Sequence, residues 1–327
     1  MYNNNAASAG ASPRAALLPA NPSFAGHQTF VLRWGWLKKG LDALTDGKHG
    51  GPDFFTRKDA LVHLGVGKNM VQSIRYWLLA TRMAHEVPDT RGRALEPTPL
   101  GCLLLGKAGD AEAGWDPFLE DDATAWLLHW LLAGPGSLSF TWVWTFNCFR
   151  EYEFSRETLV ESVFAGAEVS VRKAPSRETV ARDVECLLHT YAGAGKSRGS
   201  LEDLLGCPLG YLKLIQPAFD RQFRFAIGAK PSLPPRIFYY AMVEYWQWRW
   251  ANSLTVSVRD LSFDEGSPGR VFKLDEESVL AYLDGLSDET AGRLRFEDTP
   301  LTREVVRDGG ADLESLKQEF LGKYYGA

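Results

Sequence analysis

The chain has 327 residues, of which 45% are hydrophobic and 24% are charged, a balance typical of folded globular domains. It has no run of about 18 apolar residues, so no membrane-spanning helix is expected. The four cysteines stand far apart, which argues against a disulfide framework or a cysteine zinc site and indicates a cytoplasmic protein with reduced thiols. Residues 1–23 are rich in Ala, Ser, Asn and Pro and lack the pattern of a signal peptide, so we expect a disordered tail there.

The net charge of −5 is distributed unevenly. Residues 24–107 hold 12 Lys or Arg against 7 Asp or Glu, whereas residues 108–170 hold 2 against 11. A basic module beside an acidic one suits a DNA-contacting part attached to a part that faces a protein partner or binds a divalent metal. A merely solvated acidic surface is the commonest explanation of such charge and stays open.

The pattern of apolar residues and turns predicts three units in a mainly α fold with small β ribbons, an α+β class. Residues 24–107 are expected to form a winged-helix DNA-binding domain. Residues 108–195 are expected to form an acidic helical domain. Residues 196–327 are expected to form a C-terminal α+β domain, in which a helix capped near Asp275 and a following ribbon suggest a second winged-helix-like piece.

Residues 54–106 carry the pattern of a winged helix-turn-helix. Thr56, with Asp59 three residues on, predicts the start of a first helix that ends near Leu64. Glycines then form a turn before a second helix, whose buried stripe is predicted at Met70, Ile74, Trp77 and Leu78. A turn over residues 89–93 predicts the wing.

The exposed face of the second helix carries the side chains that a recognition helix places against phosphates and base edges. These are Lys68, Asn69, Gln72, Ser73, Arg75 and Tyr76. Arg91 and Arg93 stand at the expected wing tip, and Arg33 and Lys38 add positive charge around a helix predicted over residues 34–44. The alternatives are a small helical subdomain with a solvated polar face, or a winged helix that binds protein.

The acidic unit contains candidates for catalysis. Asp121 or Asp122 is expected to cap an apolar helix, and Glu120 and Asp121 precede His129 in a pattern that could hold Mg²⁺ or Mn²⁺ and activate water. His27 is a second candidate, as a general base or phosphate ligand. The alternative is that the acids cap a helix, that His129 is a satisfied core histidine, and that His27 bonds to backbone, because no spacing here is diagnostic of a nuclease.

The run Gly193-Ala194-Gly195-Lys196-Ser197 resembles the end of a phosphate-binding loop. The first glycine of that motif would fall at Thr190, and the run follows a helix where the motif requires a strand. We therefore expect no ATP site in this chain.

Several runs of the sequence resemble the SspB-type family. Residues 24–40 show the pattern F-x-G-H-[EQ]-T-F-x-x-R-x-x-W-L-K-K-G, and further matching runs lie at 65–77, 116–130, 183–188 and 266–274. The likeness extends from about residue 24 to residue 307. The family favours Glu where this chain has Gln28, so we assign Gln28 no catalytic role.

The resemblance implies a component of the bacterial Ssp DNA phosphorothioation system, which replaces a non-bridging phosphate oxygen by sulfur. It implies a DNA-nicking protein that works on double-stranded DNA with a cysteine desulfurase, an ATPase and a sulfur-transfer enzyme, away from the membrane and associated with the nucleoid. Two other functions remain open: a non-catalytic DNA-binding adaptor that recruits the sulfur-transfer enzymes, and a winged-helix transcriptional regulator.

Overall fold

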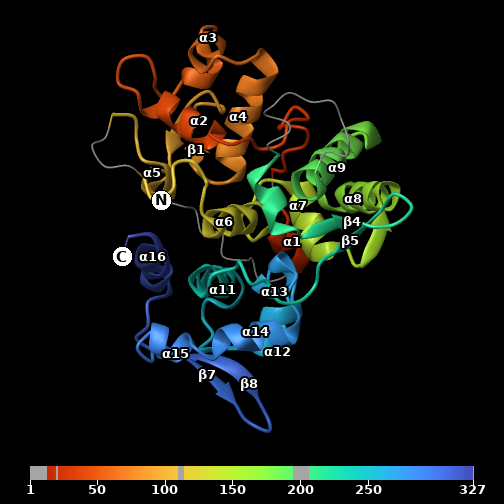
Figure 1. Ribbon diagram of the computed structural model, residues 1–327, viewed down its shortest axis with the longest axis vertical. Helices are drawn as coiled ribbons and strands as arrows, with labels where there is room; N and C mark the ends of the chain where they lie inside the picture. Colours follow the sequence, from red (N-terminus) through yellow and green to blue (C-terminus); the bar gives the residue numbers. More distant parts are fainter. Residues whose placement is uncertain (1–12, 20, 110–113, 194–205, 327) are drawn as a thin grey trace.

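The computed structural model describes residues 13–19, 21–109, 114–193 and 206–326. Its first unit begins with four helical segments: α2 (Trp36–Thr45), η1 (Phe54–Thr56), α3 (Ala60–Leu64) and α4 (Lys68–Ala80). The antiparallel hairpin β1 (Ala84–Glu86) and β2 (Leu95–Pro97) follows, and then α5 (Pro99–Leu105). In Figure 1 this unit forms one end of the molecule's longest axis.

Two glycines let the elements of the first unit approach closely. A Cβ atom at Gly40 would lie 2.7 Å from Ile74 Cγ2, so α2 can press against α4 only because this residue has no side chain. A Cβ atom at Gly101 would lie 2.1 Å from the carbonyl oxygen of Met83, where α5 folds back on the start of the hairpin. Thr98 caps α5 by accepting from the amide of Gly101 at 3.0 Å.

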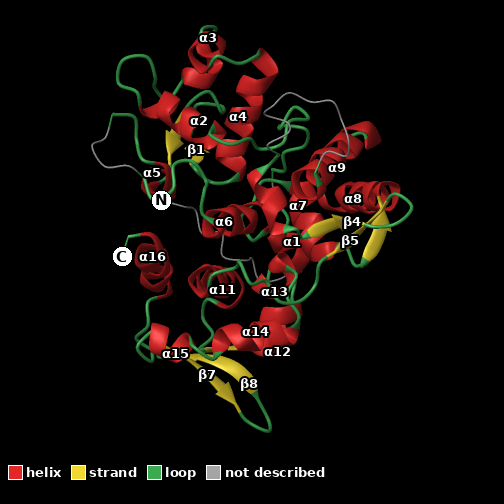
Figure 2. Cartoon of the chain, in the orientation of Figure 1, coloured by secondary structure: helices red, strands yellow, loops and turns green. Residues whose placement is uncertain are grey.

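The middle unit is helical (Figure 2). It consists of α6 (Asp122–Ala133), α7 (Phe140–Val143), the π-helical turn η2 (Trp144–Cys148), α8 (Arg156–Ser170) and α9 (Arg177–Ala192). A three-stranded antiparallel sheet lies beside them, with β3 (Glu153–Ser155) and β4 (Ile215–Pro217) flanking β5 (Gln222–Phe225). This sheet joins strands from both sides of the domain boundary expected at residue 195.

The last unit begins with η3 (Pro208–Leu212) and the long helix α11 (Pro235–Trp250). It continues through β6 (Thr255–Ser257), α12 (Val258–Phe263), α13 (Pro268–Phe272), α14 (Glu276–Leu283) and α15 (Leu286–Glu289). The strands β7 (Leu294–Asp298) and β8 (Arg303–Arg307) form a hairpin, and β6 completes a sheet of order β6-β8-β7. The terminal helix α16 (Leu313–Tyr325) packs along α11.

One hydrophobic core runs through all three units, and its largest fully buried side chains include Trp77, Trp126, Trp142 and Trp246. Arg82, at the end of α4, ties the first unit to the last by donating to Glu244 of α11 at 2.9 Å. Trp130 of α6 donates to the other oxygen of the same carboxylate. The described residues therefore form one packed body.

The mainly helical α+β class with small antiparallel ribbons is confirmed. Two local expectations are wrong. Thr56 does not cap the first helix, because residues 54–56 form a separate 3-10 turn and α3 starts at Ala60. Residues 13–19 are not part of a disordered tail, since α1 (Pro13–Leu17) buries Leu17, and Arg14 forms an ion pair with Glu265.

Candidate nucleic-acid interface

The exposed start of α4 is built by the turn that precedes it. Gly65 ends α3 in the left-handed conformation with φ of 63°, and Gly67 leads in extended conformation into Lys68. Lys68, Asn69 and Gln72 are exposed, and none has a side-chain partner within the described part of the chain. The positive end of the helix dipole and these exposed donors lie together at the start of α4. This combination favours the binding of an anionic phosphate backbone.

Two residues predicted for this face are buried instead. Ser73 and Tyr76 point into the core, where the Tyr76 hydroxyl lies 2.9 Å from the Ser139 hydroxyl. The prediction placed them outside because its buried stripe was too narrow: Ile74, Trp77 and Leu78 are buried as predicted, but the buried face of α4 also includes Val71, Ser73 and Tyr76. They are removed from the DNA-contacting set.

Arg75 connects α4 to the tip of the β1–β2 hairpin. Its Nη2 atom donates to Glu86 Oε1 at 2.7 Å and to the carbonyl oxygen of Gly92 at 2.8 Å. Lys68, Gln72 and Arg75 are spaced four and three residues apart, so they share one face of the helix. The contact to Gly92 therefore holds the hairpin tip against the same face of α4 that Lys68 and Gln72 occupy.

The hairpin tip presents two exposed arginines. Arg91 and Arg93 flank Gly92, and no residue that the structure describes binds either guanidinium group. Asp89, Arg91 and Gly92 have positive φ angles of 63°, 54° and 71°, which make the turn tight. The tip is consequently a fixed projection with two cations at its end.

Arg33 and Lys38, also predicted to contact DNA, already interact with neighbouring side chains. Arg33 lies over the rings of Phe30 and Trp36, with its guanidinium carbon 5.5 Å and 5.3 Å from their centroids. Lys38 forms an ion pair with Asp42 one helical turn on. Of the residues predicted to contact DNA, those that are exposed and have no side-chain partner in the described structure are Lys68, Asn69, Gln72, Arg91 and Arg93.

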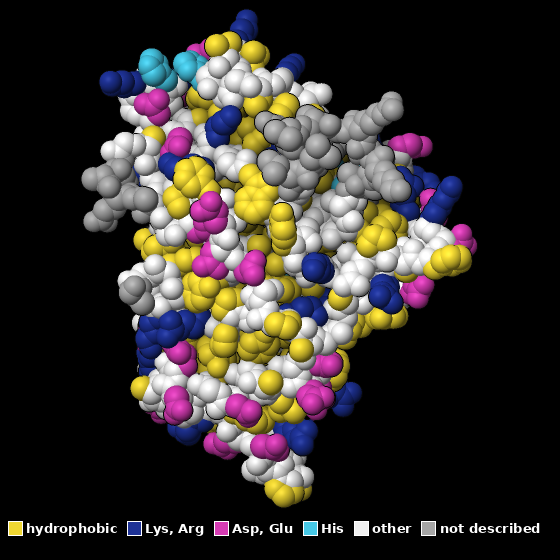
Figure 3. Space-filling view, in the orientation of Figure 1, with side chains coloured by type: hydrophobic (Ala, Val, Ile, Leu, Met, Phe, Trp, Pro, Cys, Tyr) yellow, Lys and Arg dark blue, Asp and Glu magenta, His cyan; other side chains and the backbone are white. Residues whose placement is uncertain are grey.

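The sequence analysis missed a pair of histidines at the same end of the molecule. The rings of His49 and His63 stack at a centroid distance of 5.5 Å, and His63 Nε2 lies 3.2 Å from Asp59 Oδ2. Arg57 also pairs with Asp59. Figure 3 shows His, Lys and Arg side chains around this end. Fourteen residues separate the two rings, so only the folded chain reveals their contact.

The acidic segment around residues 116–122 caps α6 and contacts the terminal helix α16. Asp121 caps α6 by accepting from the amide of Ala123 at 2.8 Å, and it also accepts from the hydroxyl of Tyr324 at 3.0 Å. Asp116 accepts from the amides of Glu120 and Asp121 at 2.9 Å and 3.0 Å. These contacts correspond to the capping alternative, and they leave Glu120 exposed at the edge of a shallow depression.

His129 lies in the core, away from solvent. Its Nε2–H donates to the carbonyl oxygen of Val271 at 2.9 Å, so Nδ1 accepts from the Tyr191 hydroxyl at 2.7 Å. Burial lowers the pKa of this imidazole from 6.5 to about 3, so it is neutral in the folded protein at ordinary pH. The geometry favours the core-histidine alternative, because no reacting group can reach either nitrogen.

His27 is equally enclosed. The amide of Thr29 donates to Nδ1 at 3.0 Å, so Nε2 carries the proton and donates to Asp183 Oδ1 at 2.8 Å. Asp183 also accepts from the amide of Ala25 and from the hydroxyl of Thr141. The pair fastens residues 24–30 to α9 and α7. Neither sequence spacing nor composition pointed to Asp183 as the partner, because 156 residues separate it from His27.

Within the described ranges, no three His, Cys, Asp or Glu side chains come together as a metal site. Glu120 and Asp121 share the depression with Asp122, but Asp121 is already occupied by its cap and by Tyr324. The residues present therefore do not form a ready cage for Mg²⁺ or Mn²⁺. Residues 194–205, which include the lysine of the phosphate-loop-like run, lie outside the described structure.

The comparisons with known proteins agree with one another. Residues 24–325 match the family described as Protein of unknown function (DUF4007). The magnesium ion-bound SspB crystal structure superposes with a TM-score of 0.85 at 31% identity, covering 97% of this chain and 91% of that one. A second SspB crystal structure gives a TM-score of 0.84 at 31% identity, with 96% and 91% coverage.

The chain belongs to the SspB family. The resemblance inferred from the sequence motifs is thereby confirmed, and it associates the chain with the Ssp phosphorothioation system. No curated protein matches the sequence. No helix within the described residues is both long and apolar enough to cross a membrane.

Proposed function

We propose that this chain is the DNA-binding component of a phosphorothioation system and that it contacts duplex DNA through α4 and the β1–β2 hairpin. The observation that carries the proposal is the bond from Arg75 to the Gly92 carbonyl. It brings two free arginines at the hairpin tip beside the exposed face that begins at Lys68. Such an arrangement matches a winged helix, in which the second helix enters the major groove and the wing follows the backbone.

The free side chains suit both parts of this contact. Gln72 and Asn69 have amide groups that can read an adenine edge, while Lys68, Arg91 and Arg93 carry charges that neutralise phosphates. The surrounding stretch supports the same reading, since residues 36–97 hold 10 Lys or Arg against 7 Asp or Glu. DNA binding would also place the protein at the nucleoid.

Strand nicking is the second part of the proposal and follows from the family. One SspB crystal structure is magnesium ion-bound, so we propose that nicking by this chain depends on a divalent cation. The described part of the acidic segment presents no preassembled metal site, and His27 and His129 are buried away from any phosphodiester. The geometry therefore assigns no catalytic step to Glu120, Asp121, His129 or His27.

This mismatch favours one competing function, a non-catalytic adaptor that holds DNA for the other proteins of the Ssp system. An adaptor needs the basic face and a surface for its partners, but no metal. Its partners would be the ATPase, the sulfur-transfer enzyme and the cysteine desulfurase that the family implies.

Fluorescence anisotropy with a labelled duplex tests the binding face. The double variant Lys68→Ala/Gln72→Ala should weaken binding about tenfold or more, because it removes a phosphate contact and a base contact. Arg259→Ala provides the matched control, since Arg259 is an exposed arginine in the last unit. Equal affinities of the wild type and the Lys68/Gln72 variant would refute the proposed face.

A supercoiled plasmid tests the nicking. Open circles that form with Mg²⁺ or Mn²⁺ and disappear with EDTA would establish a metal-dependent nickase. The variant Glu120→Ala/Asp122→Ala changes two exposed acids and leaves the cap Asp121 in place, so loss of nicking in a folded variant would move the site back to the acidic segment. A clear gel shift without nicking, in the presence of the partner proteins, would establish the adaptor.

A further inference from the structure

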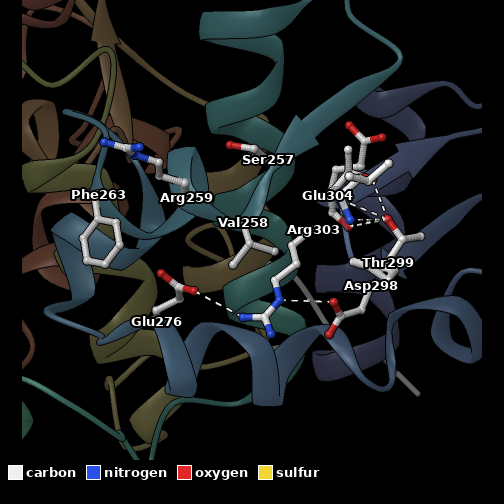
Figure 4. A pocket seen from close by; sticks show the side chains of 12 residues that line it. Ser257, Val258, Arg259, Phe263, Glu276, Asp298, Thr299, Arg303 and Glu304 are labelled. Carbon is white, nitrogen blue, oxygen red and sulfur yellow. Dashed lines mark hydrogen bonds and ion pairs between the residues drawn. The ribbon is translucent and has the colours of Figure 1, made fainter.

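A large depression lies at the opposite end of the molecule from the proposed DNA face. It has a volume of about 1110 Å³ and lies between the tip of the β7–β8 hairpin and the first turns of α12 and α14 (Figure 4). Figure 1 shows this hairpin projecting at the far end of the long axis from α3. The depression has both apolar and acidic lining.

Its apolar part is held outward by a rigid turn. Leu301, at the hairpin tip, is 95% exposed, and Phe263, at the end of α12, is 49% exposed. The turn is fixed by Thr299, whose amide donates to the Thr302 carbonyl at 2.9 Å and whose hydroxyl accepts from the Thr302 amide at 3.0 Å. A leucine presented in this manner is preorganised for a contact, although one exposed leucine alone would not mark a site.

Acidic side chains outnumber basic ones in the lining of the depression by three to two, with Glu276, Asp298 and Glu304 against Arg259 and Arg303. Arg303 is neutralised between Asp298 and Glu276, at 3.1 Å and 3.6 Å, as the dashed lines in Figure 4 show. Arg259 and Glu304 also line the depression. Over residues 255–307 there are 7 Lys or Arg against 12 Asp or Glu. Figure 3 shows numerous acidic side chains at this end of the molecule.

The two ends share a plan but differ in charge. Each has a helix that precedes an antiparallel hairpin, α4 directly before β1–β2, and α14 before β7–β8 with the short helix α15 between them. The first helix starts with Lys68 and Asn69, whereas α14 starts with Glu276 and Glu277 behind the capping carboxylate of Asp275. Carboxylates at that position repel phosphates, so the second hairpin unit is unsuited to DNA.

We propose that this depression binds a segment of a partner protein in which basic residues alternate with leucine-like side chains. Its basic residues would face the acids of α14 and the hairpin, and its apolar side chains would pack between Leu301 and Phe263. Complementary charge provides orientation and the central apolar contact provides affinity. The proposal does not depend on DNA binding at the other end.

Fluorescence anisotropy with a labelled peptide of alternating Lys and Leu provides the test. The full-length chain should bind this peptide and should not bind a peptide in which Glu replaces Lys. Leu301→Ser should weaken binding about tenfold, as should Glu276→Lys. Phe219→Ser is the matched control, because Phe219 is 92% exposed on the connection between β4 and β5 and should leave binding unchanged.

Three results would overturn the proposal. The first is equal peptide affinity in the wild type and in Leu301→Ser. The second is a loss of duplex DNA affinity in Leu301→Ser, which would make the depression a nucleic-acid site. The third is a wild-type protein that sediments as a dimer while the Leu301→Ser variant sediments as a monomer. The occupant of the depression would then be a second copy of the chain. Unchanged duplex affinity in the same variants separates this test from that of the proposed function.

Discussion

Acid should destabilise this protein partly through His129. The folded state keeps the imidazole neutral, because burial lowers its pKa from 6.5 to about 3. The unfolded chain protonates the same group near its ordinary value. Stability from this group is therefore complete above pH 6.5 and is lost as the pH falls toward 3.

The magnitude follows from the difference in bound protons. Between these two pKa values the unfolded state binds one more proton, so each pH unit costs about 1.4 kcal/mol. A change from pH 6.5 to about 4.5 would then remove roughly 2–3 kcal/mol, a large part of the roughly 5–15 kcal/mol that stabilises a typical domain. Carboxylates also titrate in this range, so the contribution of His129 must be isolated as a difference.

The contribution of His129 is isolated by urea unfolding of the wild type and of His129→Gln at several pH values. The glutamine variant will be less stable at neutral pH, but its free energy of unfolding should fall less steeply below pH 6.5, by about 1.4 kcal/mol per unit. Nuclear magnetic resonance of the wild-type imidazole provides a check that needs no variant. A titration of the His129 signal with a midpoint near 6, or identical pH slopes in the two proteins, would refute the reasoning.

Three further predictions concern the first unit. Arg75→Ala should free the hairpin tip and weaken binding to all duplex sequences about equally, as measured by anisotropy. If the variant instead lost its preference at one base pair alone, Arg75 would contact that base pair directly. Loss of Arg91 and Arg93 together should reduce the log–log salt slope of DNA binding by about two units, one for each phosphate contact, and an unchanged slope would contradict that role. Gly101→Ala should destabilise the fold by about 1–3 kcal/mol in thermal or urea unfolding, because the new methyl group meets a backbone carbonyl; Gly309→Ala, in open space, should have little effect, and equal stabilities would refute the contact.

Local signals in the sequence located several helices. The caps Asp121 and Asp275 each mark a helix that begins within a residue of its predicted start. Capping acts over a few residues, so the sequence displays it directly. The β7–β8 hairpin was found for the same reason, since its two strands lie close together in the chain.

The contacts that decide the candidate site are long-range, and the sequence does not display them. The bond between Arg75 and Gly92 spans 17 residues, and that between His129 and Val271 spans 142. His129 follows Glu120 and Asp121 in the sequence, which suggested catalysis. In the structure its ring is buried and donates to the carbonyl oxygen of Val271. The predicted buried stripe of α4 was too narrow, because Ser73 and Tyr76 are buried as well, and the Ser139 hydroxyl that Tyr76 contacts is 63 residues away in the sequence.

The arrangement of the two ends has a mechanical consequence for the proposed role. A continuous core joins them, and Glu244 links the end of α4, through Arg82, to α6 and α11. A hinge needs few buried contacts, and this junction has many. DNA held at α4 and a partner held at the β7–β8 hairpin would thus stand at a fixed separation and orientation. A protein built in this way can deliver an enzyme to a defined position on DNA without itself carrying the reacting groups, which is why the adaptor remains the sharpest alternative to the nickase.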